Sequence, residues 1–503
     1  REVYTFTKRV AEYFKGRVNA WEVWNEPDIG FWPDLGDTFA GVQKAAYLGF
    51  KAGDPELPVL MASFCRGYCA FDDNLMESGL RDYFDIFNWH IYAAPEAYPT
   101  TLSRYLGLLE RYDCADRPVW LSEAGIRVMG SEPGGELTAA DERKQAEFVP
   151  KSFAYTLAAG TDRHFFFVYP YYLERGVQFG SLRRDLSPRP GFIAIAAAAD
   201  LLGQSEYLGQ YTLEQATALA FDTPQGKTLV IWSNTPQTVE LEAPAKVKVA
   251  DLFGREKPAA VTGGKLKLSV GPSPQYVIGL GDLAGHLSGT VRPQGKLPVN
   301  NPCPVILRGQ AQVAVLDKTR NCYLITGEPI KYTVEVCNLT EKSSARGEVA
   351  LEVPAGWSCE PKTAAVSLEP MGRSVVEFTL TGAPAAGATE KVWVRPSFAG
   401  VQGTVQPSMS YLGLDICRVK RIETHDLDLA DQMAWSLNIE GNCMLGIVSG
   451  SADGNRSNSK FTDPVYGWFY PPALFERARH FSHYEWIGFE YRCHGDDDST
   501  TVR

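Results

Sequence analysis

Five short apolar runs alternate with helical stretches in the first 200 residues, and this alternation most constrains the fold. The runs lie at 20–25, 59–63, 85–92, 118–123 and 164–169. Most of their residues are apolar, β-branched or aromatic, as in strands that are buried on both faces of a sheet. Their starts are about 26 to 46 residues apart, which is the size of a βα unit. The pattern therefore predicts a parallel α/β fold.

Helical periodicity fills the segments between these runs. Residues 1–16, 38–52 and 102–112 carry apolar side chains at helical spacing. Thr138 and Asp141 have the spacing of a capping box, which predicts a helix that begins there. Five strands are too few for a closed eight-stranded barrel. We therefore expect either an open sheet or the second part of a barrel whose first strands precede this chain.

Beyond residue 203 the helical pattern gives way to short strand-like runs. A turn at 222–226 predicts a hairpin in the first of them. We expect a β-sandwich over 204–282 after the α/β region of 1–203, a linker over 283–309 and an Ig-like β-sandwich over 310–412. The linker is rich in Gly, Pro and Asn. Residues 413–503 read as a last β-rich segment with an aromatic cluster at Tyr466, Trp468, Phe469 and Tyr470.

The composition excludes several classes of function. The net charge is 49 − 60 = −11 and no block of Lys and Arg occurs, so we expect no nucleic-acid partner and favour a neutral substrate. No apolar run approaches 18 residues, so we expect no membrane span. Ten cysteines in 503 residues are too few for a disulfide scaffold, which leaves buried thiols or one or two disulfides. Cys65 and Cys69 lack a second pair at zinc-site spacing, so no metal or other cofactor is expected.

Two glutamates stand where apolar runs end. Glu26 follows the run 20–25, and Glu123 closes the run 118–123. The carboxyl ends of parallel strands are where catalytic groups gather, and burying an unpaired carboxylate there is costly. Paired carboxylates suit glycosidic cleavage, in which one protonates the leaving oxygen and the other attacks the sugar or activates water. The alternative is that each Glu pairs with an Arg in the sheet.

The motifs around these glutamates resemble a known group of enzymes. Trp-Asn-Glu-Pro at 24–27 resembles the strand-four signature of clan A glycoside hydrolases, which are retaining (β/α)8-barrel glycosidases. Trp-Leu-Ser-Glu-Ala-Gly at 120–125 matches the nucleophile on strand seven of that clan, and His-Ile-Tyr at 90–92 matches a His-x-Tyr on strand six. The resemblance covers about residues 1 to 280, and families 5 and 39 are the nearest in character.

The resemblance implies roles for individual residues. Glu26 would be the acid/base and Glu123 the nucleophile. Asn25 would donate to the sugar 2-hydroxyl, unless it only caps the strand. Tyr92 would hold the nucleophile ionised and His90 would contact substrate, unless both are satisfied polar groups of the core. Sugar platforms are expected from Trp32, Tyr169, Tyr171 and Tyr172, with packing as the alternative, and loop contacts from Arg127 and Arg175, with solvated charges as the alternative.

The resemblance also implies an architecture. Residues 1–203 would hold strands four to eight of the barrel, 204–282 the sandwich attached to it, and 413–503 a truncated module similar to a jelly-roll carbohydrate-binding module. The strands before Arg1, with a substrate-binding Arg, would be missing. A half barrel leaves two sheet edges unpaired, so we expect the activity of the complete protein and not of this chain alone.

The sequence therefore predicts a secreted retaining glycosidase, extracellular or periplasmic, that cleaves β-glycosidic bonds of a plant or microbial polysaccharide or oligosaccharide. The alternative is a non-catalytic carbohydrate-binding protein derived from such an enzyme. A structural cell-surface protein is a third hypothesis, which rests on the tandem sandwiches alone. The sugar, the linkage, exo or endo action and the oligomeric state stay open.

Overall fold

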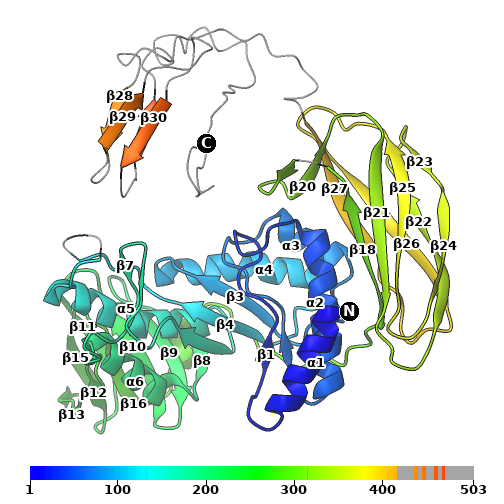
Figure 1. Ribbon diagram of the computed structural model, residues 1–503. Helices are drawn as coiled ribbons and strands as arrows, with labels where there is room; N and C mark the ends of the chain where they lie inside the picture. Colours follow the sequence, from blue (N-terminus) through cyan, green and yellow to red (C-terminus); the bar gives the residue numbers. More distant parts are fainter. Residues whose placement is uncertain are drawn as a thin grey trace. The chain divides into compact units, whose positions relative to one another are not determined.

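The computed structural model describes residues 1–415 except 131, 133 and 314, together with the backbone of four strands between 436 and 470. The chain divides into two compact units, Arg1–Ile416 and Cys417–Arg503. The first unit contains an α/β region and two β-sandwiches (Figure 1).

The α/β region is built on five parallel strands in chain order. Strand β1 pairs with β2, β3 with β4 and β4 with β5, all in parallel. Parallel bridges from Leu60 to Ile86 and from Phe64 to Trp89 join β2 to β3. The predicted parallel α/β fold is therefore confirmed for this region. The strands are β1 (Trp21–Glu22), β2 (Val59–Leu60), β3 (Phe87–Ile91), β4 (Val119–Ala124) and β5 (Arg163–Phe166).

Helices connect these strands and cover them (Figure 1). Phe64, Phe87, Trp89 and Tyr105 are fully buried between helices and strands. Thr138 and Asp141 form the predicted capping box at the start of α5. The helices are α1 (Glu2–Phe14), α2 (Gly36–Gly53), α3 (Ala70–Glu77), η1 (Pro95–Ala97), α4 (Tyr98–Arg111), α5 (Ala139–Ala158) and α6 (Pro190–Leu202), and the small hairpin β6 (Leu173–Glu174) and β7 (Val177–Gln178) lies between the last two.

The first sandwich follows α6. Its seven-stranded sheet has the order β13-β12-β16-β10-β9-β8-β17 and faces the three-stranded sheet β11-β15-β14 across one core. The predicted hairpin is β9–β10, which pairs Thr223 with Gly226. Helices α5 and α6 pack on the other face of the larger sheet. The strands are β8 (Glu206–Tyr211), β9 (Thr217–Thr223), β10 (Gly226–Trp232), β11 (Gln237–Glu242), β12 (Lys248–Ala250), β13 (Glu256–Pro258), β14 (Val261–Thr262), β15 (Lys265–Val270), β16 (Gln275–Leu280) and β17 (Leu287–Ser288), with η2 (Ala284–His286) before the last.

The second sandwich packs a four-stranded sheet, β18-β21-β25-β23, on a six-stranded sheet, β19-β20-β27-β26-β22-β24. One core of Val, Leu, Ile, Tyr and Phe side chains fills the space between the sheets. The strands are β18 (Val305–Ala311), β19 (Leu316–Asp317), β20 (Cys322–Ile325), β21 (Ile330–Asn338), β22 (Ala345–Glu352), β23 (Ser358–Glu360), β24 (Thr363–Leu368), β25 (Arg373–Thr381), β26 (Thr389–Ala399) and β27 (Ser408–Leu414).

The structure corrects the linker predicted over 283–309. Its beginning pairs with β8 as β17, and its end is already strand β18. The part between is an extended strap bonded to the α/β region. Arg292 donates to the carbonyl oxygens of Gly160, Ala115 and Arg117 at 2.8, 2.9 and 2.6 Å. Gly, Pro and Asn suit a free linker and an extended strap equally, so composition could not separate the two.

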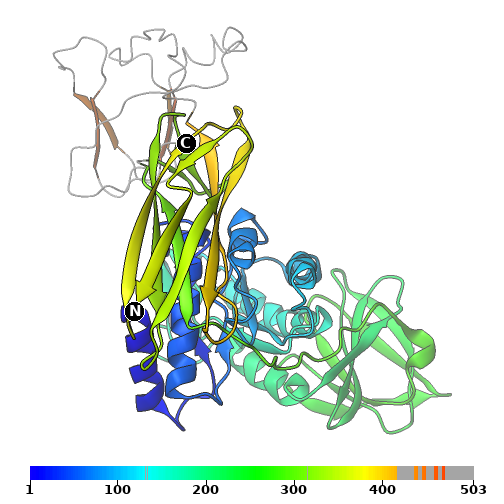
Figure 2. The same ribbon diagram turned by 90° about the vertical axis from the view of Figure 1, so that its right-hand side faces the viewer.

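A buried polar interface joins the second sandwich to α2 and α3 (Figure 1 and Figure 2). The carboxylate of Asp37 accepts hydrogen bonds from Ser410 and, at 3.1 Å, from Tyr323. Asn74 donates to the carbonyl oxygen of Met409 at 2.6 Å. Burial raises the pKa of Asp37 to about 7, with Asp34 adding to the rise. The sandwich is therefore held against the helices by specific bonds.

The second unit is described only by backbone strands. Strand β28 (Ser436–Ile439) pairs with β31 (Gly467–Tyr470), and β29 (Met444–Val448) pairs with β30 (Asn458–Thr462), both antiparallel. The side chains of the predicted aromatic cluster lie outside the described residues, as does the rest of the predicted jelly-roll-like module.

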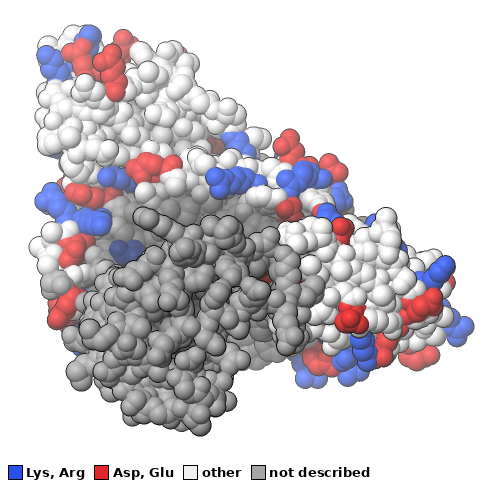
Figure 3. All heavy atoms as spheres, turned by 90° about the horizontal axis from the view of Figure 1, so that it is seen from above, with Lys and Arg blue, Asp and Glu red and all other residues white. Residues whose placement is uncertain are grey.

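Surface and cysteine features bear on the predicted class. The seven cysteines of the described residues are free thiols. No helix of the described residues is both long and apolar enough to cross a bilayer. On the described surface in Figure 3, acidic and basic side chains are interspersed, without one large patch of a single charge.

Candidate active site

Four polar side chains lie in a row across the carboxyl ends of the parallel strands. Glu26 follows β1, Ser63 follows β2, His90 is on β3 and Glu123 is on β4. The backbone extends this pairing beyond β2, because the Ser63 amide donates to the Trp24 carbonyl at 3.4 Å. Parallel strands bring their carboxyl ends to one edge, which is why residues up to 97 positions apart meet here.

Glu26 is held in a restricted backbone conformation. Its φ is 43°, in the left-handed region that costs a non-glycine residue about 1–3 kcal/mol. The Glu26 amide donates to Ser63 Oγ at 3.3 Å, and its carbonyl oxygen accepts from the Ile29 amide at 3.3 Å. Only 8% of the residue is exposed. The turn after β1 therefore aims this carboxylate at the strand ends.

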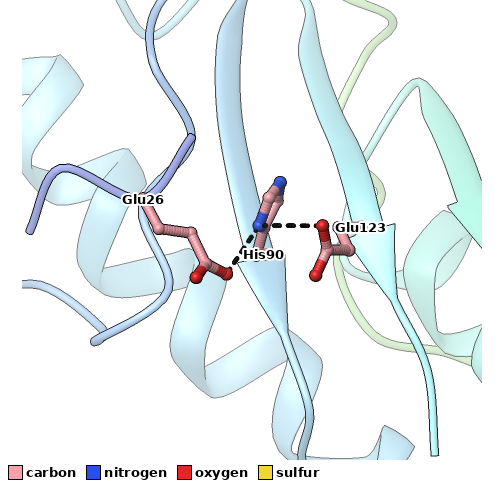
Figure 4. A group of neighbouring side chains, drawn as sticks. All are labelled: Glu26, His90 and Glu123. Carbon is pink, nitrogen blue, oxygen red and sulfur yellow. Dashed lines mark hydrogen bonds and ion pairs between the residues drawn. The ribbon is translucent and has the colours of Figure 1, made fainter. Parts of the chain in front are cut away.

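His90 lies between the two carboxylates (Figure 4). Its Nδ1 is 2.8 Å from Glu26 Oε1 and 3.7 Å from Glu123 Oε2. A bulge between Trp89 and His90 sets His90 opposite Glu123 in the β3–β4 pairing. On the other side of the ring, Nε2 lies 2.9 Å from Ser122 Oγ. The imidazole is thus fixed at both nitrogens, with 3% of its residue exposed.

Glu123 carries the hydrogen bond that the resemblance implied. The Tyr92 hydroxyl donates to Glu123 Oε1. Burial raises the pKa of Glu123, and the charge of Glu26 adds to this, while the bond from Tyr92 and the charge of His90 oppose it. Burial also raises the pKa of Tyr92, so this hydroxyl stays protonated as a donor. The guanidinium of Arg127 lies 5.4 Å from the centre of the Tyr92 ring.

A shallow pocket of about 280 Å³ opens beside these groups. The predicted Asn25 lines it together with His90 and Glu123. Trp24 also lines it and has 41% of its surface exposed. The full lining is Glu22, Trp24, Asn25, His90, Ser122 and Glu123. The pocket therefore offers an aromatic face, an amide and the carboxylates of Glu22 and Glu123, whereas Glu26 is not among its lining residues. Such groups bind sugar hydroxyls and ring faces.

The predicted platforms do not line this pocket. Trp32 is half-buried, and its Nε1 donates to Leu35 O at 3.3 Å and to Thr38 Oγ1 at 3.1 Å, at the start of α2. Its ring packs edge-on against Trp24 with centroids 5.9 Å apart. Tyr169 is 62% exposed, and its ring lies 5.8 Å from that of Phe192. Tyr171 is half-buried, and the exposed ring of Tyr172 packs on Phe167.

A buried carboxylate, Asp28, and a thiol, Cys65, lie near Glu26. Asp28 Oδ2 accepts from the amides of Arg66 at 2.7 Å and Cys65 at 3.1 Å. Burial raises the pKa of Asp28 to about 6, and the nearby Glu26 adds to the rise. Burial raises the pKa of the Cys65 thiol as well, with Asp28 and Glu26 adding to it. The thiol beside the site is therefore kept neutral and is a poor nucleophile.

Sequence reasoning missed Trp24, Ser63 and Ser122 as members of the site. Trp24 was visible only as part of the Trp-Asn-Glu-Pro motif. The two serines are small hydroxyls without a distinctive spacing, and their contacts depend on the register between strands. Glu26, His90 and Glu123 also form a group that could ligate a metal ion, although the sequence carries no metal-binding motif.

The chain was also compared with known proteins. No family model matches it, and no curated protein does. Among solved structures, a family 39 glycoside hydrolase from the gut symbiont Bacteroides cellulosilyticus is 20% identical, with a TM-score of 0.42 over 54% of this chain and 60% of that chain. This chain thus spans less than two thirds of that protein.

Two further solved structures are similar at the same level. A GH39 β-xylosidase from Caulobacter crescentus is 15% identical, with a TM-score of 0.40 over 55% of this chain and 71% of that chain. A GH30 endoxylanase from Clostridium papyrosolvens is 11% identical, with a TM-score of 0.40 over 56% of this chain and 72% of that chain.

Proposed function

We propose that this chain carries the catalytic carboxylates of a retaining glycoside hydrolase that cleaves β-glycosidic bonds of a polysaccharide or oligosaccharide. The supporting observation is that a carboxylate oxygen of Glu26, one of Glu123 and a ring nitrogen of His90 all lie within 4.8 Å of one another. Retaining glycosidases hold their carboxyl groups about 5–5.5 Å apart, whereas inverting enzymes leave about 6.5–9.5 Å for a water.

The two glutamates take different roles in this mechanism. Two like charges this close favour a state in which the pair holds one proton. Glu26 donates that proton to the glycosidic oxygen while Glu123 attacks the anomeric carbon, so the C–O bond to the leaving group breaks and a glycosyl ester forms. Glu26 then takes a proton from water, which attacks the ester and releases the sugar and the Glu123 carboxylate.

The neighbouring residues support these steps. The Tyr92 hydroxyl stabilises the charge on Glu123 before attack and after release. His90 keeps Glu26 aimed across the gap to Glu123. Asn25 and Trp24, which line the pocket, contact the sugar that is cleaved. We further propose that β1–β5 are strands four to eight of a (β/α)8 barrel, and that the protein acts outside the cytoplasm.

The experiment measures hydrolysis of a panel of 4-nitrophenyl β-glycosides by the complete protein and by its Glu26→Gln and Glu123→Gln variants. Losing an acid/base group costs about 10²- to 10⁴-fold, so we expect Glu26→Gln to lose at least a hundredfold in kcat. Glu123→Gln lacks the nucleophile, and we expect it to lose at least as much. The control is Glu174→Gln, at an exposed position of β6. Full activity of Glu123→Gln would refute the proposal.

The same experiment distinguishes the proposed glycosidase from the main alternative. A non-catalytic carbohydrate-binding protein would hydrolyse none of the glycosides. It would also keep its affinity for immobilised polysaccharides in Glu123→Gln, because binding does not need a nucleophile. Glycan binding without turnover would therefore support that alternative.

A further inference from the structure

We propose that Glu26, His90 and Glu123 form a binding site for a divalent transition-metal cation, best matched by Zn²⁺, and that the bound ion inhibits the enzyme. The group supplies one nitrogen and two carboxylate ligands on three different strand ends (Figure 4). Binding of the ion stands on this geometry alone. Its inhibitory effect rests on the function proposed above.

The spacing of the ligand atoms fits a tetrahedral ion. Zn²⁺ bonds to nitrogen and oxygen of about 2.0–2.1 Å place neighbouring ligands of a tetrahedron about 3.3 Å apart. His90 Nδ1 lies 2.8 Å from Glu26 Oε1 and 3.7 Å from Glu123 Oε2, so the two observed distances bracket that value. The ligand oxygens of Glu26 and Glu123 lie within 4.8 Å of each other, so binding of one ion by both requires their side chains to rotate toward it. Two of the three ligands, His90 and Glu123, line the pocket of about 280 Å³, so solvent reaches this side of the group.

The surroundings of His90 match those of a metal-bound imidazole. A ligating histidine usually donates its other ring N–H to a fixed acceptor, which sets the tautomer and ring orientation. His90 Nε2 lies 2.9 Å from Ser122 Oγ. The Ser122 amide is itself anchored, because it donates to Asn88 Oδ1 at 3.2 Å. Without an ion, Nδ1 and Glu26 Oε1 share a proton across 2.8 Å. Binding of the ion displaces that proton, so that Nε2–H donates to Ser122 Oγ and the Nδ1 lone pair faces the ion.

The charge and ligand type of the group select the ion. Glu22 Oε1 lies 4.0 Å from His90 Nε2, so a third carboxylate adds to the negative field around the imidazole. A dication offsets the repulsion between Glu26 and Glu123. An imidazole ligand favours Zn²⁺ over Mg²⁺ or Ca²⁺, which prefer oxygen alone. The bound ion occupies both carboxylates at once, so neither proton donation nor nucleophilic attack can occur while it is present.

The test is a calorimetric titration of the full chain with ZnCl₂ near pH 7, and of Glu123→Gln and Ser122→Ala, whose folding is first checked by thermal unfolding. Zn²⁺ sites elsewhere in the chain are the same in every variant, so differences report on this group. We expect one site to be lost in Glu123→Gln and weakened about 10- to 100-fold in Ser122→Ala, as is typical of a lost partner of a ligating histidine.

The matched control is His286→Ala. Its Nε2 lies 3.6 Å from Glu242 Oε2, which makes a histidine–carboxylate pair outside the three-ligand group. We expect His286→Ala to bind Zn²⁺ at the three-ligand group as the wild type does. We expect a titration of the wild type with MgCl₂ to leave that group unfilled. Equal Zn²⁺ binding by the wild type and Glu123→Gln, or no binding by the wild type, would overturn the proposed site.

Inhibition is measured separately with the 4-nitrophenyl glycosides. We expect hydrolysis to fall as this site fills and to recover with a chelator. Hydrolysis that is unaffected by the filled site overturns the inhibitory role. A complete protein that binds Zn²⁺ at this site but hydrolyses nothing when metal-free contradicts the glycosidase function and leaves the metal site standing.

Discussion

Removal of the Tyr92 hydroxyl tests the electrostatics of the nucleophile. Burial raises the pKa of Glu123, and the hydrogen bond from Tyr92 opposes that rise. A hydrogen bond to a charged group contributes about 1.5–3 kcal/mol, which corresponds to about tenfold to a hundredfold in an equilibrium. In Tyr92→Phe the ring keeps its edge-on contacts with Phe167 and Phe179, at 6.1 and 5.5 Å, so packing is preserved.

The assay is the pH dependence of kcat/KM for the best 4-nitrophenyl glycoside. Glu123 must be ionised to attack, and without the donor its protonated form persists to higher pH. We therefore expect the acid limb of the profile to move to higher pH and kcat/KM at acidic pH to fall about tenfold to a hundredfold. A profile that falls evenly at every pH, with its acid limb unmoved, would refute this reasoning.

Three further variants test other parts of the structure. Trp24→Ala removes the exposed aromatic wall of the pocket, and we expect KM to rise about tenfold with little change in kcat. Arg292→Ala leaves three carbonyl oxygens of the α/β region without their donor, and we expect a loss of about 3 kcal/mol in urea unfolding. Asp37 has its pKa raised to about 7 by burial, so stability present at low pH is lost as pH rises through that value. The side chain that Asp37→Asn introduces does not titrate, so we expect the free energy of unfolding of this variant, relative to that of the wild type, to rise by about 2 kcal/mol from pH 5 to pH 8. Urea unfolding at each pH measures this difference.

Each of these variants has a control. Trp32→Ala should lower the melting temperature and leave KM close to that of the wild type, because the Trp32 indole is hydrogen-bonded to the start of α2. Arg143→Ala and Asp113→Asn change exposed charges and should leave urea unfolding within about 0.5 kcal/mol of the wild type. An unchanged KM in Trp24→Ala, wild-type stability in Arg292→Ala, or an Asp37→Asn advantage that shrinks with rising pH would each contradict the corresponding expectation.

The features that sequence reasoning predicted best depend on a few neighbouring residues. The capping box of Thr138 and Asp141 and the β9–β10 turn each have a signal within five positions. The convergence of Glu26, His90 and Glu123 followed from a general property of parallel strands, which end at the same edge. The pattern of parallel strands, together with the polar residues at their carboxyl ends, was enough to predict which residues form the candidate site.

The features that could not be predicted depend on register and on distant contacts. Ser122 reaches His90 only because the β3–β4 pairing is shifted by a bulge. The choice between Trp24 and Trp32 as the exposed ring depends on which indole bonds to α2. The docking of Asp37 onto Ser410 joins residues 373 positions apart, and no local pattern marks such a pair.

The stereochemistry of the first-formed product tests the central claim most directly. The claim is that Glu26 and Glu123, close enough to share one imidazole, act by double displacement. Proton NMR during hydrolysis of an active 4-nitrophenyl β-glycoside shows which anomer appears before mutarotation. The account predicts the β-anomer first, with the signal absent in Glu123→Gln. An α-anomer as the first product would contradict it.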